Sequence, residues 1–280
     1  MKIIEDADHI KLQQDIDRIV KWSIDNKLYF NTTKCCVLSF SCARSPRQHQ
    51  YCIEGTPLKR VTEIKDLGVS FTSDLNFRKH VVEVCKKAYR NLGFLLRQAH
   101  HFSNIAALKA LYEALVKSHL EGNAVIWSPY EDKYIKMLDR IQNKFVRFIY
   151  LKRYGAYPGY PLLYPTLFVL GMVGYYKLEA RREVALATYV VKVLRGETHN
   201  PAVLQAARLS VPDGYAERRR RPPLLEVSRA RTNLLRMAPL TRALRTLNTV
   251  ANTVDLFTCS LNEFTKVTYC VASKLECNFM

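Results

Sequence analysis

The sequence lacks the short motifs that mark many enzyme active sites. It has no glycine-rich phosphate loop followed by Lys-Ser or Lys-Thr, and no Gly-x-Ser-x-Gly turn. His119-x-Glu121 matches half of a zinc-deaminase signature, but no Pro-Cys-x-x-Cys follows it. These absences argue against a P-loop NTPase, an α/β-hydrolase and a zinc deaminase.

Paired cysteines are also missing. The chain has eight cysteines, but none forms Cys-x-x-Cys, and no histidine pair stands near them at zinc-finger spacing. No basic and then apolar segment follows Met1, so we expect reduced thiols in the nucleus or cytoplasm. Cys85 lies beside the apolar face of a predicted helix and is expected in the core.

Acidic residues are scarce relative to basic ones. The chain has 43 Lys and Arg against 25 Asp and Glu, a net charge of +18. Such a balance indicates nucleic acid or an anionic membrane surface as partner. The longest uncharged run, residues 155–176, contains Pro158, Pro161 and Pro165, which interrupt a membrane-spanning helix. We therefore expect a nucleic-acid partner and no membrane, with a membrane-associated protein as the remaining alternative.

Residues 64–97 combine a short extended run with a long amphipathic helix. Residues 64–71 form the run, and Ser73 or Asp74 is a natural N-cap for the helix. At about 100° per residue, one helix face is apolar. That face carries Val81, Val84, Ala88, Leu92 and Leu95.

The opposite face of this helix carries a row of cations. We call it the cationic row: Lys79, Lys86, Arg90 and Arg97. The segment from Arg78 to Arg97 holds six Lys and Arg but only one acid, Glu83. A solvated surface is one explanation, but like charges without acids between them repel each other. A bound polyanion accounts for the row more directly.

The remaining pattern predicts an α+β fold: a small antiparallel sheet with one helix, followed by a mostly α-helical region. The first helix is expected at residues 8–25, and strands at residues 37–40, 51–53 and 58–61. Further helices are expected at 104–127, at 132–150 and at 167–194, where an interruption is expected near Gly171 and Gly174. A short helix is expected from Asn200-Pro201, and a last one opened by Pro239. Cations Arg140, Lys144 and Arg147 lie to one side of the helix at 132–150.

Residues 218–245 contain nine arginines and one acid. The first four are Arg218, Arg219, Arg220 and Arg221. No helical or strand periodicity organises the first half of the segment, so we interpret it as a flexible basic arm. It is either an ordinary surface tail or a phosphate-binding or nuclear-import segment. A stand-alone basic RNA- or DNA-binding or scaffold protein would use this arm.

Asp6 and Asp8 form the carboxylate pair that we considered for two-metal catalysis. They precede a helix instead of lying on a tight strand-turn-strand. The sequence therefore predicts no complete catalytic site and no catalytic residue in this chain.

Several short motifs occur in a familiar order. They are Leu12-Gln13-Gln14-Asp15-Ile16-Asp17, Trp22-Ser23, Asn31-Thr32-Thr33-Lys34-Cys35, Lys65-Asp66-Leu67-Gly68-Val69, Lys87-Ala88-Tyr89-Arg90-Asn91-Leu92-Gly93-Phe94 and Ile141-Gln142-Asn143-Lys144-Phe145. Together they resemble the reverse transcriptase of non-LTR (LINE-type, jockey-like) retrotransposons. The resemblance covers residues 8–152 and weakens beyond them. Gly122 departs from it, because the family usually has an aromatic residue there.

The resemblance implies four regions. They are a palm remnant with a primer-grip-like hairpin (1–75), a helical thumb-like domain (76–153), a helical extension after a Tyr/Pro/Gly linker (154–216), and the basic arm with a C-terminal helix and tail (217–280). Leu67, Gly68 and Val69 match the primer grip. Lys34 matches the lysine near the phosphates of the incoming nucleotide. The alternative interpretation, that Lys34 is an ordinary surface lysine before a strand, stays open.

The resemblance also implies an RNA-directed DNA polymerase that uses Mg²⁺ in its complete form. The family's catalytic aspartates, in a Tyr/Phe-Ala-Asp-Asp turn, would lie just before Met1. This chain would then bind template-primer, supply no metal ligand or cofactor of its own, and depend on a separate catalytic part.

Overall fold

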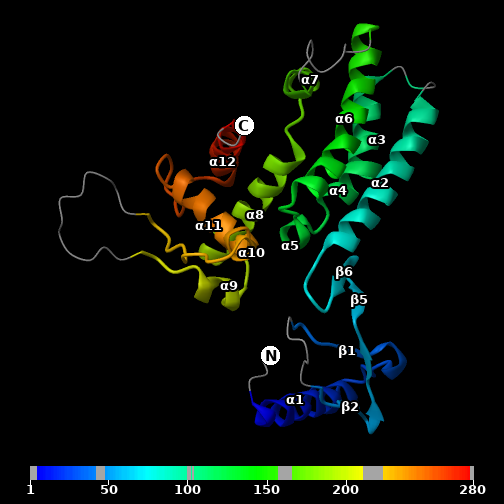
Figure 1. Cartoon of the computed structure of the whole chain (residues 1–280), viewed down its shortest axis with the longest axis vertical. Helices are drawn as coiled ribbons and strands as arrows, with labels where there is room; N and C mark the ends of the chain where they lie inside the picture. The colour runs from blue at the N-terminus through cyan, green and yellow to red at the C-terminus, as the bar shows by residue number, and fades with distance from the viewer. Residues whose placement is uncertain are drawn as a thin grey trace, which may run out of the picture. The chain divides into compact units, whose positions relative to one another are not determined.

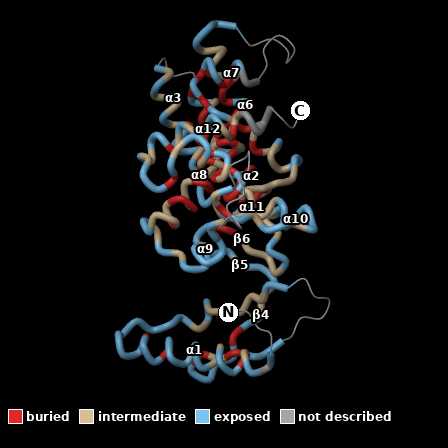
Figure 2. The backbone as a smooth tube through the Cα atoms, turned by 90° about the vertical axis from the view of Figure 1, so that its left-hand side faces the viewer, coloured by how far each residue is buried: buried red, intermediate tan, exposed pale blue. Residues whose placement is uncertain are grey.

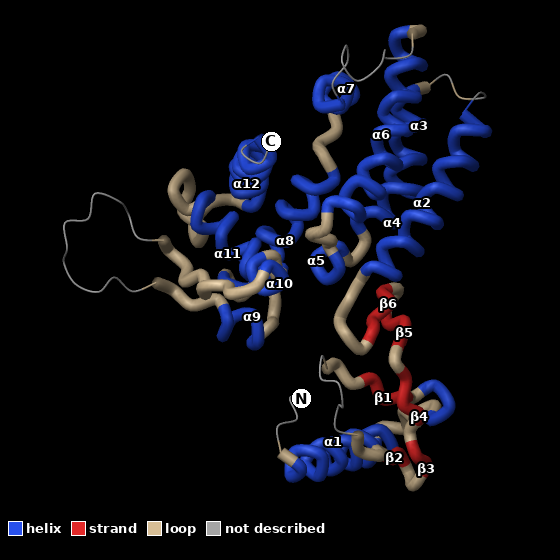
Figure 3. Tube along the Cα trace, viewed as in Figure 1, coloured by secondary structure: helices blue, strands red, loops and turns tan. Residues whose placement is uncertain are grey.

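The computed structural model describes residues 5–41, 48–99, 102, 104–156, 166–210 and 223–277 (Figure 1). The chain is mixed α+β and mostly helical, and it divides into two compact units, Met1–His80 (unit 1) and Val81–Met280 (unit 2). Within the described residues, all the strands belong to unit 1 (Figure 3). Buried residues follow the helices of unit 2 in Figure 2.

Unit 1 begins with helix α1 (Asp6–Asp25), as the sequence predicted. Its first turn has a capping box, in which the Asp8 carboxylate accepts the Glu5 backbone N–H at 3.0 Å. Asp8 therefore serves the helix N-terminus. One side of α1 buries Val20 and half-buries Leu12 and Ile16 against the residues that follow β1.

The side chain of Gln13 joins α1 to strand β2 (Cys52–Ile53). It accepts the Cys52 N–H at 3.0 Å and donates to the Cys52 carbonyl at 2.9 Å. Beside it, Tyr51 is buried and its hydroxyl lies 2.6 Å from His9 Nδ1. The small core around Tyr51, Ile53 and Leu58 therefore has polar contacts on its α1 side.

The strands of unit 1 form three two-stranded ladders. After the 3-10 turn η1 (Thr32–Lys34), β1 (Cys36–Leu38) pairs in parallel with β4 (Lys59–Val61). The antiparallel pairs are β2 with β3 (Thr56–Pro57), and β5 (Glu63–Asp66) with β6 (Val69–Thr72). The expectation of one antiparallel sheet is therefore wrong in detail, because the β2–β3 hairpin between β1 and β4 returns the chain in the direction of β1.

Helix α2 (Arg78–Gln98) begins later than the expected cap. Asp74 Oδ1 accepts from the Thr72 hydroxyl at 2.6 Å and from the Asn76 N–H at 3.2 Å, so it stabilises the turn before the helix. The hydrogen bond from the Thr72 hydroxyl is the main reason that the pKa of Asp74 lies below its usual value, and the bonds from Asn76 add to this effect. Asn76 Oδ1 accepts the Arg78 N–H at 2.9 Å, which makes it the side chain that satisfies the start of α2.

The single helix expected at residues 104–127 is broken. Asn104 caps α3 (Ile105–Tyr112), and a π-turn, η3 (Glu113–Lys117), leads into α4 (Ser118–Glu121). Gly122 then leaves the helical region at ψ 123°, and Asn123 takes a left-handed φ of 55° before α5 (Ala124–Trp127). The Gly122 carbonyl, freed from the helix, accepts the Trp127 indole N–H at 2.7 Å.

Helix α6 (Asp132–Tyr154) ends at Gly155, which has a left-handed φ of 72°. Helices α7 (Thr166–Val173) and α8 (Leu178–Leu194) are separated at Gly174, which has a left-handed φ of 81°. Gly174 is one of the two glycines near which an interruption was expected, and the other, Gly171, lies within α7. The Tyr/Pro/Gly linker lies largely outside the described residues. Asn200 caps α9 (Pro201–Ala206) as predicted, its side chain accepting the Val203 N–H.

The C-terminal part of unit 2 packs on α8. It comprises α10 (Asn233–Arg236), α11 (Pro239–Val250) and α12 (Leu261–Cys277). Pro239 opens α11 as predicted, but α12 follows, so α11 is not the last helix. Buried side chains of α8, α11 and α12 form one core together with Ala207, Leu225 and Leu256. The members from the three helices are Leu186, Ala187, Val190, Val191, Ala243, Leu244, Leu247, Val250 and Phe264.

The described part of residues 218–245 is folded, contrary to the flexible arm that we expected. Leu225 is fully buried, and Asn248 bonds both its N–H and its carbonyl at 2.8 Å. Arg242 pairs with Glu183 at 3.1 Å. Apolar residues such as Leu225 hold this segment to the core. From the sequence, we weighed the arginines of the segment and gave these apolar residues no weight. Arg218, Arg219, Arg220 and Arg221 lie outside the described residues.

Candidate nucleic-acid interface

Helix α2 has the two faces that its sequence predicted. The apolar residues Val81, Val84, Ala88, Leu92 and Leu95 are each at most 9% exposed. Cys85 is 2% exposed beside them, and burial raises the pKa of its thiol to about 11. This face fixes the rotation of the helix, so the opposite face has to meet solvent.

The four members of the cationic row are all exposed. Lys79 belongs to unit 1, where its ammonium lies 2.6 Å from the Glu63 carboxylate. Lys86, Arg90 and Arg97 belong to unit 2 and lie within about 40° of one another around the helix axis. Lys79 is therefore partly neutralised, and the available positive charge of the row centres on the other three.

The β5–β6 hairpin, where the sequence placed a primer grip, has an unusual turn. Leu67 and Gly68 have φ of 45° and 86°, both left-handed, as a two-residue type I′ turn requires. A Cβ on Gly68 would meet nothing within 4 Å, so its glycine is needed for φ and not for close packing. Leu67 is 89% exposed, while Val69 is buried. The tip therefore offers Leu67 and Gly68, but not the Val69 side chain, to a partner.

Strain at Leu67 is a second observation on this turn. A left-handed conformation costs a branched residue about 1–2 kcal/mol, and Asn or Gly would avoid most of it. The leucine side chain meanwhile gains little from burial at 89% exposure. Strained residues of this kind occur at functional sites more often than elsewhere.

Lys34 closes η1 in unit 1 and is exposed. Lys34 and the hairpin are thus surfaces of unit 1, whereas Lys86, Arg90 and Arg97 are surfaces of unit 2. Within unit 2, Lys86, Arg90 and Arg97 lie together because they share α2.

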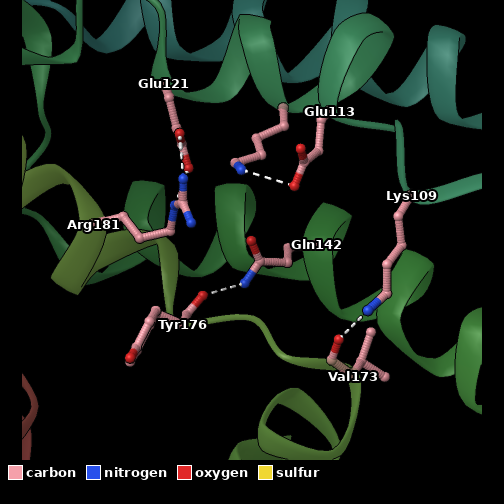
Figure 4. A network of polar contacts seen from close by, with 8 residues as sticks. Lys109, Glu113, Glu121, Gln142, Val173, Tyr176 and Arg181 are labelled. Carbon is pink, nitrogen blue, oxygen red and sulfur yellow. Dashed lines mark hydrogen bonds and ion pairs between the residues drawn. The ribbon is translucent and has the colours of Figure 1, made fainter. Parts of the chain in front are cut away.

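Sequence reasoning missed a polar network in unit 2, between the α3–α4 segment, α6 and the start of α8 (Figure 4). Arg181 pairs with Glu121, with Nη2 3.0 Å from Oε2. Lys109 donates to the Val173 carbonyl, and Gln142 donates to the Tyr176 carbonyl at 2.8 Å. Its members lie far apart in sequence, so helical spacing alone could not reveal it.

Aromatic side chains pack behind this network. Tyr112 and Phe145 stack at 3.9 Å, and Tyr175 meets both at an angle. Burial, the largest cause, raises the pKa of both Tyr112 and Tyr175 well above the usual phenol value. Neutral phenols of this kind do not act as bases near neutral pH. The network positions α8 against the α3–α4 segment.

A second buried cluster lies on the other side of α8. Arg182 is 2% exposed, and burial lowers the pKa of its guanidinium while Asp139, Glu179 and Glu183 oppose that shift. Burial likewise raises the pKa of Glu183, and Arg242 opposes it. Charges of both signs neutralise each other here, so the cluster is structural.

Among the described residues, no group of three or more His, Cys, Asp or Glu could hold a metal ion. In the same residues, no helix is both long and apolar enough to cross a membrane.

Comparison with known protein families, with curated proteins and with solved structures gives no match for this chain.

Proposed function

We propose that this chain binds the sugar-phosphate backbone of a nucleic-acid duplex through Lys86, Arg90 and Arg97 of α2. We further propose that the duplex is the template-primer of a non-LTR retrotransposon reverse transcriptase, and that the chain is the palm-end and thumb part of that polymerase. The catalytic aspartates would come from another part of the enzyme.

The observation that carries the proposal is the rotation of α2. Its apolar face is buried, so the side chains of Lys86, Arg90 and Arg97 stand together on the exposed face over about 17 Å of helix. Phosphates repeat along a duplex, and a row of cations can neutralise several of them without reading sequence. The net charge of +18 favours the same class of partner.

The hairpin supports the polymerase part of the proposal. Its tip presents an exposed, strained leucine next to a glycine, where the resemblance places the primer grip. An apolar side chain at such a tip can pack on the sugar or base of a primer end. Such a contact would explain why a strained leucine is retained at the tip.

The test is duplex binding by the Lys86→Glu, Arg90→Glu double variant. We expect at least a tenfold loss of affinity for an RNA–DNA duplex of about 15 base pairs, measured by fluorescence anisotropy. The Lys21→Glu, Lys266→Glu double variant is the matched control, since it changes the net charge by the same amount and both residues are exposed cations outside the row. An equal loss in both proteins would show that only net charge matters and would overturn the assignment to α2.

The alternative, a stand-alone basic protein that uses its arginine segment, makes the opposite prediction. Replacing Arg218, Arg219, Arg220 and Arg221 with glutamine would then abolish binding, and the α2 variant would bind normally.

A primer-extension assay with Mg²⁺ addresses catalysis. We expect no incorporation by this chain, and any incorporation would refute the proposal that the aspartates lie elsewhere.

A further inference from the structure

Helix α6 carries another exposed row of cations, on a different element from the proposed duplex site. Its buried face consists of Leu138, Ile141, Gln142, Phe145, Val146 and Ile149. Opposite that face, at about 100° per residue, lie Lys136, Arg140, Lys144 and Arg147 within about 80° of one another. The first three are exposed and Arg147 is half-buried.

Acids are nearly absent from this face. The acids of α6 are Asp132, in its first turn, and Asp139, which lies close enough to the buried Arg182 to influence its pKa. The α6 cations therefore have no neutralising partner within their own row, and a polyanion would relieve their mutual repulsion.

Two tyrosines continue the same face beyond the cations. Tyr154 falls at the angular position of Lys136, and Tyr150 lies about 40° to the side away from the other cations. The rings of the two tyrosines lie 4.6 Å apart at 43°. Tyr154 is 42% exposed, and the Arg153 guanidinium lies 5.5 Å from its ring centre. The face thus offers phosphate-binding cations followed by an exposed aromatic ring, over about 27 Å of helix.

We infer that this face of α6 binds a single strand of nucleic acid. Lys136, Arg140, Lys144 and Arg147 follow its phosphates, and an unpaired base stacks on Tyr154, supported by Tyr150. A duplex buries its base faces and cannot use the ring, whereas every unpaired base has a face to stack, so the site accepts any sequence. This inference does not depend on the duplex site of α2.

The tyrosine half of the inference is tested with Tyr154→Ala and Tyr154→Phe. The probes are a labelled oligonucleotide of about 12 unpaired nucleotides, as RNA and as DNA, and an abasic strand with the same phosphates. Stacking contributes about 1–3 kcal/mol per base, so Tyr154→Ala should lower affinity for the single strand by about fivefold or more. It should leave the abasic strand within twofold, and Tyr154→Phe should bind like the parent chain. Equal effects of Tyr154→Ala on the two strands would overturn the stacking contact.

The cation half is tested with the Lys136→Glu, Arg140→Glu double variant, again against the Lys21→Glu, Lys266→Glu control. We expect at least a tenfold loss of single-strand affinity, with unchanged far-UV circular dichroism. The slope of log affinity against log salt should shrink by about 0.7 for each lost phosphate contact. Unchanged single-strand binding would overturn the site.

The two sites are separable in the same experiments. The α6 variant should keep its duplex affinity, and the Lys86→Glu, Arg90→Glu variant should keep its single-strand affinity. Loss of duplex binding alone in the α2 variant, with no effect of either α6 change, would retain the proposed function and sink this inference. The reverse result would sink the proposed function and leave this inference standing.

Discussion

At the scale of single residues, Leu67 is the clearest case of a side chain kept against its local preference. It has φ 45° at the tip of the β5–β6 hairpin and is 89% exposed. Asn tolerates the left-handed region better than a branched residue does. We expect Leu67→Asn to stabilise unit 1 by about 0.5–1.5 kcal/mol, measured as a shift in the urea midpoint of unit 1 fluorescence.

The matched change for that experiment is Leu28→Asn, because Leu28 is also a highly exposed leucine of unit 1 but is not among the residues with positive φ. It should change stability by less than about 0.5 kcal/mol. Equal effects of the two substitutions would show that polarity, and not backbone conformation, is responsible.

Cys85 gives a pH prediction at the same scale. Burial raises the pKa of its thiol from 9.0 to about 11, so the thiol stays protonated at pH values where an ordinary cysteine already forms thiolate. Any stability from this neutral thiol is present below pH 9 and is lost as the pH rises through about 11.

We therefore expect iodoacetamide at pH 8.5 to modify the exposed Cys270 at least tenfold faster than Cys85, as followed by peptide mass spectrometry. In urea the two rates should converge. Fast labelling of Cys85 in the folded chain would contradict the burial of this face of α2.

At the scale of elements, the position that ends α4 requires glycine, Gly122, because a side chain there has no space. A Cβ at this position would lie 2.7 Å from the Ser118 carbonyl oxygen, a backbone atom that cannot move aside. We expect Gly122→Ala to destabilise unit 2 by about 1–3 kcal/mol, measured by thermal or urea unfolding.

Gly93, in the interior of α2, is the matched control. Its added Cβ would lie 3.6 Å from the end of the Arg97 side chain, an ordinary contact. Alanine is the better helix former, so Gly93→Ala should stabilise by about 0.5–1 kcal/mol. Destabilisation by both changes would mean that helix propensity and space do not decide these positions.

Periodic sequence predicted the elements well where burial is one-sided. The apolar faces of α2 and α6 follow helical spacing, and α2 was found with the expected buried side chains. The break at Gly122 and the parallel pairing of β1 with β4 were not foreseen, because a clash with Ser118 and a strand register depend on distant backbone. Arg242, which the sequence assigned to the basic arm, instead pairs with Glu183 of α8 for the same reason.

At the scale of the whole molecule, the charge of +18 predicts how binding depends on salt. For a duplex, log affinity should fall linearly with log salt, with a slope of about −0.9 for each neutralised phosphate. The Lys86→Glu, Arg90→Glu variant should have a slope smaller by about 1.8 if each residue contacts one phosphate. A salt-independent affinity would contradict backbone binding as the main source of affinity.

The functional surfaces could be predicted only in part. Lys86, Arg90 and Arg97 follow from helical spacing, because their own helix places them. A site that combines Lys34, the hairpin and α2 does not follow, since those residues belong to different units and helical periodicity carries no information across a domain boundary.

The π-turn at η3 has a consequence for how this segment tolerates changes in length. It closes its turn with one residue more than an α-helix uses. Because the turn holds that residue locally, deleting one residue between Glu113 and Lys117 would restore regular α-helical winding and leave α4 facing as it does now. Glu121 would then still meet Arg181.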